Sequence, residues 1–363
     1  MSYRRLWPAA SSPSQPEKGL LGPSDIRCCL TASGALRDTT DDFDTRCDAY
    51  WSQRTATAQT SGAVLFNEMK FRLAGFSAAG DDAGVPEGVP RARLELELGL
   101  TDYREHLVTN GSTSFVPRAG GVPSNGANAL GVECVLLTSD RQAVLFRRSP
   151  RVSQYAGWFC CPGGHAEPRR LLSNTALLSI APGRLIPPPP SLFPPPTSHD
   201  PSASSMQPTQ TATLREWRND LLAEALPMCD EQRLRDATVA ELFHAAWDEI
   251  VEELGIDTSH GSEPASASPS CVRIRGLAAL VVDDLGKPDA VFVAETSLSA
   301  AAVKKSFDAR VGADAFESDV NSLLCIPCSV DRASRDPWRS MLPLGAQVTP
   351  PSAACLDAVW NMS

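Results

Sequence analysis

The sequence contains no long hydrophobic run. None of its apolar stretches approaches the roughly 18 residues that a membrane-spanning helix needs. The first residues, MSYRRLWPAASSPSQPEKGLLG, contain two arginines but no apolar core of a secretory signal. We therefore expect a protein that does not work in a membrane and that is cytoplasmic, or nuclear as well, with an organelle transit peptide as the alternative.

Positive charge is also scarce. Lysine and arginine number 33 against 43 aspartates and glutamates, so the net charge is −10 and the pI is near 5.1. A protein that binds nucleic acid through phosphate contacts needs the opposite balance. The composition therefore argues against a nucleic-acid partner, and a phosphate-bearing ligand would need local arginines or a metal ion.

The sequence has 11 cysteines but lacks the pattern of a cysteine-based site. The odd number and the scattered positions argue against a disulfide scaffold. Cys325 and Cys328 have the spacing of a redox or zinc site, but no second CxxC accompanies them. We expect free, buried thiols in a reducing compartment.

Composition and turn signals divide the chain into segments. Residues 1–24 are rich in proline and serine and are expected to be disordered. Residues 25–118 read as a mixed α+β segment and residues 125–345 as an α/β domain, followed by a tail at 346–363. A proline-rich, low-complexity insertion at about 169–212 interrupts the α/β domain and is too polar and too broken to pack. Most of this insertion is therefore expected to be dispensable.

Hydrophobic patterns predict the elements of both parts. In the first part, AVLFNEMKFRLAGFSA and ARLELELGL read as strands of a hairpin, and TDYREHLVTN as a short helix capped by Thr101. In the second part, strands are expected in ALGVECVLLTSDRQAVLFRRS, in WFCCPGG before a glycine loop, and in RIRGLAALVVDD and DAVFVAETSL. TVAELFHAAWDEIVEELGI and SAAAVKKSFDARV are the predicted helices. This order is typical of a layered α/β domain.

The first of these helices has clear predicted limits. Thr238 and Glu241 have the spacing of a capping box, and Gly255 is the expected stop. One apolar stripe runs along it, made of Leu242, Ala246, Ile250 and Leu254, with Phe243 beside them.

Three glutamates crowd the end of the same helix. Glu249, Glu252 and Glu253 repel one another at this spacing and lie at the negative end of the helix. A solvated acidic helix end is the simple interpretation. A divalent cation, Mg²⁺ or alternatively Mn²⁺, explains the placement better, because Glu249 and Glu253 border the apolar stripe whereas Glu252 lies nearer solvent.

The glycine loop and the acidic helix together resemble a known motif. WFCCPGGHAEP and AAWDEIVEELGI are similar to the Nudix hydrolase box, G-x5-E-x7-R-E-U-x-E-E-x-G-U, with U a bulky apolar residue. Gly164 opens the box, and the residues from Glu249 to Ile256 match its second half. The box is split by about 70 residues, and Asp248 stands where the family has its arginine. Counted back from Asp248, Ala240 occupies the place of the first glutamate, with Glu241 one residue late.

The split box resembles one subfamily in particular, the UDP-sugar diphosphatases of the Nudix motif 22 type. LFNEMKFRL, LELGLTDYREHLVTN, VLFRRS, PGGHAEP, VFVAETSLSAAAVKKSF and GADAFESD are similar to blocks of this subfamily, in the same order. The resemblance implies an α/β/α sandwich with the N-terminal α+β segment packed against it. It also implies Mg²⁺-dependent hydrolysis of UDP-glucose or UDP-galactose to UMP and sugar 1-phosphate. The alternatives are a Nudix hydrolase of ADP-ribose or another nucleoside diphosphate derivative, and a catalytically weak Nudix-fold binding module.

The resemblance assigns roles position by position. Glu249, Glu253 and the backbone carbonyl of Gly164 (or its neighbour Gly163) would hold the metal, and Glu252 would assist through water. Arg148 would clamp the pyrophosphate. The remaining positions that would bind substrate are Phe66, Tyr103, Ser153, Cys160, His165, Glu167 and Glu317. Cys160 replaces an acidic residue of the relatives, so the choice of base stays open.

Overall fold

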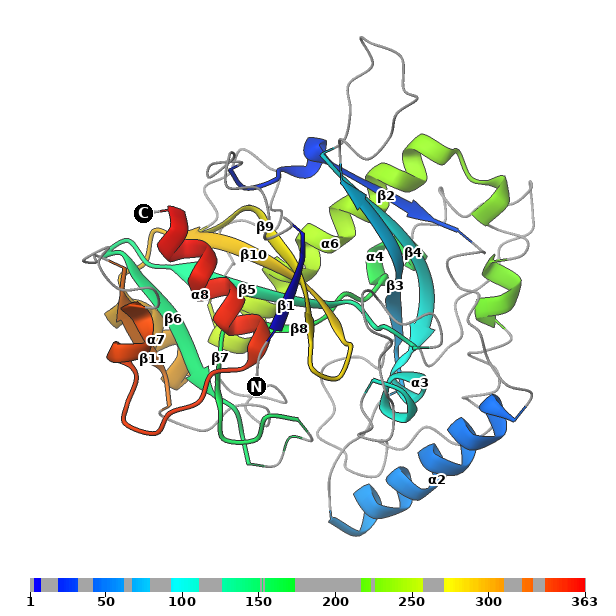
Figure 1. Cartoon of the computed structure of the whole chain (residues 1–363), viewed down its shortest axis with the longest axis horizontal. Coiled ribbons are helices and arrows are strands. Elements are labelled where there is room, and N and C mark those ends of the chain that lie inside the picture. Colours follow the sequence, from blue (N-terminus) through cyan, green and yellow to red (C-terminus); the bar gives the residue numbers. More distant parts are fainter. Residues whose placement is uncertain are drawn as a thin grey trace.

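The computed structural model describes most of the chain outside the predicted insertion (Figure 1). The described residues are 3–7, 19–31, 42–61, 67–78, 93–110, 126–150, 152, 154–173, 217–222, 226–256, 271–309, 322–328 and 337–362. The predicted boundary between the first two ordered segments falls among residues 111–125, outside this set. That boundary therefore stays a prediction.

A mixed, eight-stranded sheet forms the centre of the larger part. Its main path runs β1 (Tyr3–Trp7), β9 (Val272–Asp283), β10 (Pro288–Thr296), β5 (Gly131–Leu137), β6 (Gln142–Arg147) and β11 (Leu324–Pro327). Two short strands lie off this path: β7 (Phe159–Cys160) pairs with β6, and β8 (Gly163–His165) pairs with β5. The pairing of β10 with β5 is parallel, and the other pairings are antiparallel.

Helices cover both faces of this sheet (Figure 1). The helices are α6 (Glu231–Leu254) and α7 (Ala300–Ala309) on one face and α8 (Pro350–Met362) on the other. Strand β5 alternates between them: Val132 and Cys134 pack in one core with Ile250 of α6, and Val135 packs in a second core with Leu356 of α8. The predicted α/β/α sandwich is confirmed.

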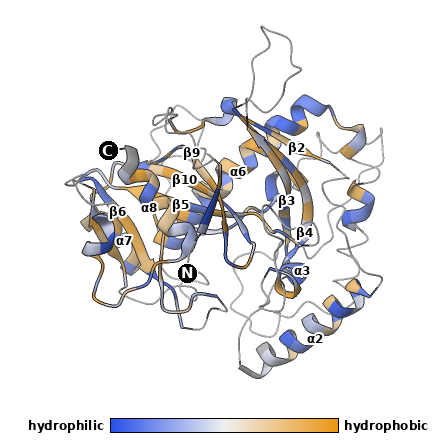
Figure 2. Ribbon diagram, viewed as in Figure 1, coloured by the Kyte–Doolittle hydropathy of each residue, from blue (hydrophilic) through white to orange (hydrophobic). Residues whose placement is uncertain are grey.

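The N-terminal part packs beside this sandwich on the α6 side. A three-stranded sheet runs in the order β2 (Ile26–Leu30), β4 (Leu94–Asp102) and β3 (Met69–Ala78), with the short helices η1 (Pro23–Asp25) and α3 (Tyr103–Val108) and the longer α2 (Phe43–Ser61). Alternate leucines of β4 are buried in the same core as α6. Figure 2 shows the central strands mainly in hydrophobic colours, whereas α2 has many hydrophilic residues. Helix α3 is capped by Asp102, whose carboxylate accepts from Glu105 N at 2.9 Å, so the expected cap at Thr101 is wrong by one residue.

Both ends of the chain differ from expectation. Residues 1–24 were expected to be disordered, but β1 pairs with the edge of β9, and Leu21 exchanges backbone hydrogen bonds of 2.9 Å with Leu277. The segment expected as a tail, 346–363, contains α8, which forms the third layer of the sandwich. The N-terminal segment takes its order from β9, more than 250 residues away in the sequence, and α8 takes its order from packing on β5, β9 and β10. Local composition does not reveal such partners.

Helix α6 begins a full two turns before its predicted start. Asp230 caps it by accepting from Arg233 N at 2.8 Å, and Thr238 lies inside the helix, donating to Leu234 O at 2.7 Å. The capping-box pattern at Thr238 and Glu241 is therefore wrong as a start signal, because threonine can also bond back to the preceding turn. The stop is confirmed: Gly255 is left-handed, with φ of 63°. The predicted apolar stripe is buried.

The predicted insertion is ordered at its beginning. Residues 169–173 form α4 (Arg169–Ser173), and both Leu171 and Leu172 are buried in the core. At its far end, residues 217–222 form a short helical segment whose Trp217 and Leu221 are buried. A final one-turn helix, η4 (Leu226–Met228), leads to α6, and η6 (Pro337–Met341) precedes α8. Among the helices described, none is long and apolar enough to cross a membrane.

Candidate active site

The two halves of the split box meet in space. Strand β8 places Gly163 and Gly164 beside β5, opposite the end of α6. A Cβ atom on Gly164 would lie 2.2 Å from Glu249 Oε1, and Gly163 N donates to Glu253 Oε2 at 2.7 Å. Glycine is needed here because the backbone and the carboxylates leave no room for a side chain. The expected glycine loop is thus a short strand whose backbone is in contact with both predicted metal-ligating glutamates.

The same geometry fits a hard divalent cation. Glu253 is buried and Glu249 is partly buried, whereas Glu252 is exposed, as its place on the helix predicts. No group of three or more His, Cys, Asp or Glu side chains with metal-ligand spacing occurs in the described ranges. Zinc takes several such side chains, but Mg²⁺ needs only one or two carboxylates together with water, backbone oxygen or phosphate oxygen. The donor set at Glu249 and Glu253 therefore suits Mg²⁺.

A third carboxylate, which the sequence reading missed, faces the same loop. Glu133 lies on β5, and a Cβ on Gly163 would be 2.6 Å from its Oε2. The hydroxyl of Ser352 on α8 donates to its other oxygen. Burial raises the pKa of Glu133 to about 7. The sequence contains a signal for this residue, because Glu133 is the one charged residue in the apolar run GVECVLL and a buried charge needs a partner or a function.

Two arginines at the end of β6 differ in their surroundings. Arg147 is exposed, and its Nε donates to Gly157 O at 2.9 Å. Arg148 is partly buried, and its Nε donates to Gln154 O at 3.2 Å. Burial has the largest effect on two nearby pKa values, because it raises that of Glu133 and lowers that of His165. The positive charge of Arg148 lowers both pKa values. The charge of Arg148 is therefore felt at the site.

Two histidines and a tyrosine meet next to the loop. His165 follows Gly164 on β8, and its ring centroid lies 5.0 Å from that of His106 on α3. Tyr103 stacks on His106 at 5.9 Å. Burial, helped by the positive charge of Lys287, lowers the pKa of both histidines, to about 3 for His106. Both imidazoles are therefore neutral near pH 7, and His106 Nδ1 and His165 Nε2 have no hydrogen-bond partner among the residues that the structure describes.

Two lysines border this group, and neither was predicted. Lys70 on β3 is paired with Glu167 and lies 3.5 Å from Glu68. Lys287, in the turn before β10, is paired with the buried Asp289. Burial alone would lower the pKa of Lys287, but the carboxylate of Asp289 raises it. Each lysine therefore stands beside the histidines as the member of an ion pair, and its charge is balanced by a neighbouring carboxylate.

The remaining predicted residues are placed less directly. Cys160 is fully buried on β7, and burial raises the pKa of its thiol well above the usual value. Glu167 is held in ion pairs by Lys70 and Arg169. Phe66, Ser153 and Glu317 lie outside the described residues.

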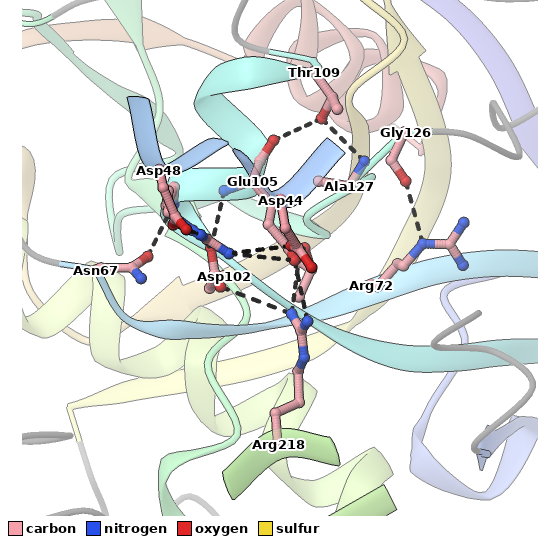
Figure 3. Close-up of polar contacts among 12 residues, drawn as sticks. Asp44, Asp48, Asn67, Arg72, Asp102, Glu105, Thr109, Gly126, Ala127 and Arg218 are labelled. Carbon is pink, nitrogen blue, oxygen red and sulfur yellow. Dashed lines mark hydrogen bonds and ion pairs between the residues drawn. The ribbon is translucent and has the colours of Figure 1, made fainter. Parts of the chain in front are cut away.

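A buried ion network supports the α3 side of the site (Figure 3). Arg218, at the returning end of the insertion, donates two hydrogen bonds to Glu105, at 2.9 and 3.1 Å. Its guanidinium also lies 3.7 Å from Asp102. Glu105 sits between Tyr103 and His106 on α3. The network therefore fixes the helix that carries these two rings.

Known proteins match this chain over limited stretches. A Bos taurus protein named uridine diphosphate glucose pyrophosphatase NUDT22 is 38% identical over 130 residues, 34% of this chain and 43% of that protein. The Homo sapiens protein of the same name is 40% identical over 114 residues, 30% of this chain and 36% of that protein. An Arabidopsis thaliana protein named Nudix hydrolase 9 is 35% identical over 124 residues, 32% of this chain and 38% of that protein. The matches thus span less than half the length of these curated relatives.

Two further comparisons add little. No family model matches the chain. The crystal structure of a NUDIX hydrolase from Alicyclobacillus acidocaldarius aligns with 64% of this chain and 90% of its own, at a TM-score of 0.30 and 15% identity. A TM-score this low does not establish a shared fold, so the fold of this chain is assigned from its own sheets and helices.

The curated relatives confirm the predicted relationship to the Nudix hydrolases. Among these relatives, the chain is similar to the proteins named uridine diphosphate glucose pyrophosphatase NUDT22.

Proposed function

We propose that this chain hydrolyses the pyrophosphate bond of UDP-sugars, such as UDP-glucose or UDP-galactose, and releases UMP and sugar 1-phosphate. The observation that carries the proposal is the meeting of Gly163 and Gly164 with Glu249 and Glu253 across the split box. The names of the curated relatives support the choice of substrate.

Glu249 and Glu253 would hold a divalent cation, Mg²⁺ or Mn²⁺, which would neutralise the phosphate charges and lower the pKa of a bound water. The glycine backbone lets the diphosphate approach these carboxylates closely. Arg148 binds a phosphate oxygen through its guanidinium, which suits a planar, charged acceptor. Exposed Glu252 assists from the solvent side, through water, and is not a ligand of the cation.

The neutral imidazoles serve the rest of the substrate. His106 Nδ1 and His165 Nε2 are buried atoms without a partner in the described part of the chain, and such groups are costly unless a ligand or water satisfies them. A neutral imidazole both donates and accepts, which suits the hydroxyls of a sugar. Tyr103 offers a flat face beside them for a ring.

Recognition of the nucleotide base is the weaker part of the proposed substrate selectivity. The buried thiol of Cys160 accepts hydrogen bonds poorly, so it is a weak partner for a uracil N–H. ADP-ribose is for this reason the second candidate substrate, and the experiment must include it.

The test is an incubation with Mg²⁺ and a panel of UDP-glucose, UDP-galactose, ADP-ribose and free nucleotides. Formation of UMP and sugar 1-phosphate supports the proposal. Formation of AMP from ADP-ribose alone would transfer the function to the second candidate. Substrate binding without any monophosphate would instead identify a binding module.

A further inference from the structure

Two charges of the split box are reversed in this chain. The box has a glutamate six residues after its first glycine and an arginine directly before the first glutamate of the helix. Here Arg170 stands six residues after Gly164, and Asp248 stands directly before Glu249. Counting back eight residues from Asp248 reaches Ala240 and misses Arg170, because the insertion lies between Arg170 and Asp248.

The reversed charges form an ion pair with each other. Arg170 Nη1 lies 2.6 Å from Asp248 Oδ2, and Arg170 Nη2 lies 2.7 Å from Asp248 Oδ1. A planar fork that meets both carboxylate oxygens has the geometry of the strongest arginine–carboxylate pairs. The pair joins α4, on the loop side of the interruption, to α6 on its far side.

A second contact fixes the same two helices. The buried carboxylate of Glu241 accepts from Arg170 N at 3.0 Å and from Leu171 N at 2.9 Å. Glu241 thereby satisfies the first backbone donors of α4. The residue that looked like a displaced box glutamate is in fact the anchor of α4 on α6.

We propose that Arg170 and Asp248 are a positioning pair of reversed polarity, which holds the glycine half of the split box in register with Glu249. The inference rests on the proposed function for its catalytic readout. Asp248 precedes Glu249 directly, and Arg170 follows Gly164 within one short segment, so the pair sets the distance between Gly164 and Glu249. No short covalent link can do this, since 78 residues separate Arg170 from Asp248 along the chain.

Because the pair is partly exposed, its effect on catalysis can be distinguished from its effect on stability. The side chains of Arg170 and Asp248 are 46% and 27% exposed. Surface ion pairs of this kind contribute little to the free energy of unfolding. The pair is therefore expected to act on catalysis much more than on folding.

The experiment is a charge-exchange cycle in the full chain. The variants are Arg170→Glu, Asp248→Arg and the double exchange, which restores the polarity of the box. The matched control is the exposed pair Arg275 and Glu295, at 2.6 Å, exchanged in the same way. Glu295 pairs with Leu137, at the opposite end of β5 from the glycine strand, so the control lies away from the site.

Each single reversal should lower kcat by about 100-fold, the loss that a misplacement of about 1 Å can cause, with little change in KM. It should also raise the Mg²⁺ concentration needed for half-maximal rate. The double exchange should recover the parent rate to within about tenfold, because coupled neighbours are non-additive. All melting temperatures and all control variants should stay near the parent values.

Three results would overturn the inference: single variants with parent rates, a double exchange as slow as the singles, or equal losses in the control pair. If the parent hydrolyses nothing on the panel, the proposed function fails, and Mn²⁺ binding followed by electron paramagnetic resonance tests the pair instead. Weaker Mn²⁺ binding in the singles and recovery in the double exchange would still support positioning. A parent that does not bind Mn²⁺ would overturn both proposals.

Discussion

Gly164 and Glu249 are in contact although 85 residues separate them in the sequence: a Cβ atom on the glycine would overlap the carboxylate, 2.2 Å from its Oε1. The neighbouring Gly163 donates its backbone N–H to Glu253. The loop and the helix end therefore form one unit, and the position of the carboxylates depends on the absence of a single methyl group.

Gly164→Ala should lower kcat by about 100-fold, because the added methyl displaces Glu249 by a distance that matters for catalysis. The melting temperature should fall only slightly, since the helix end can move. Gly19→Ala is the matched control, as nothing lies within 4 Å of a Cβ there. Steady-state kinetics and thermal unfolding of both variants provide the check. Parent-like kinetics in Gly164→Ala would contradict the assigned geometry.

The three glutamates should differ in their contribution. Glu253→Gln and Glu249→Gln should abolish Mg²⁺-dependent turnover with little loss of stability, because a neutral amide relieves repulsion but is a poor Mg²⁺ ligand. The exposed Glu252 should matter less: Glu252→Gln should stay within about tenfold of the parent rate, a change of about 1.4 kcal/mol. Rates measured across a Mg²⁺ titration test this order. Equal activity of all three variants and the parent would refute the metal site.

Arg148→Ala should raise KM and lower kcat together, since a phosphate clamp acts on the ground state and on the transition state. The loss in kcat/KM should be about tenfold or more, as for a hydrogen bond to a charged group. Arg147→Ala is the control, because this neighbour is exposed and its Nε bonds to Gly157 O. If both variants have similar kinetics, Arg148 is an ordinary surface charge.

His106 should make stability depend on pH. Its pKa is lowered to about 3 in the fold, first by burial and then by Lys287 and Lys70. The unfolded chain, with a pKa near 6.5, binds the proton more readily, so stability is lost as pH falls below about 6.5. Between pH 6.5 and pH 5 the loss is about 2 kcal/mol. His106→Gln should show a smaller drop in melting temperature over this range, and an unchanged drop would contradict the burial of a neutral histidine.

Most of the proline-rich insertion should be dispensable. The replaceable segment starts after α4, at residue 174, because Leu171 and Leu172 belong to the core. Replacing residues 174–208 by a short Gly/Ser linker should keep Mg²⁺-dependent activity within a few-fold, since the cost of closing a loop grows only slowly with its length. A linker variant that folds but is inactive would show that the segment takes part in catalysis.

Arg218, which follows the insertion, provides a control that should lose stability where the linker variant does not. Arg218→Ala, in the full chain, removes one of the two arginines paired with buried Glu105 and Asp102. It should lower the free energy of unfolding by about 3 kcal/mol. The linker variant retains Arg218 and should melt near the parent temperature.

Local patterns predicted the acidic helix well. The apolar stripe, the stop at Gly255 and the contrast between Glu252 and Glu253 follow from a helical period that any stretch of about 20 residues expresses by itself. The strands around residues 131–147 and 272–296 were recognisable for the same reason. The start of α6 was not recognisable, because a threonine such as Thr238 can either cap a helix or donate to a carbonyl of the preceding turn. The turns before Thr238 decide between these two roles.

The sequence by itself determined the main strands, the acidic helix with its stop, the box residues and their family resemblance, because these depend on neighbours along the chain. Only the tertiary structure decided which distant charges meet. Glu133, Lys287 and His106 join the site from separate strands and helices, and Arg170 finds Asp248 across the insertion. Such pairings depend on how sheets and helices pack, and a buried or paired charge is recognised by its surroundings rather than by its sequence neighbours.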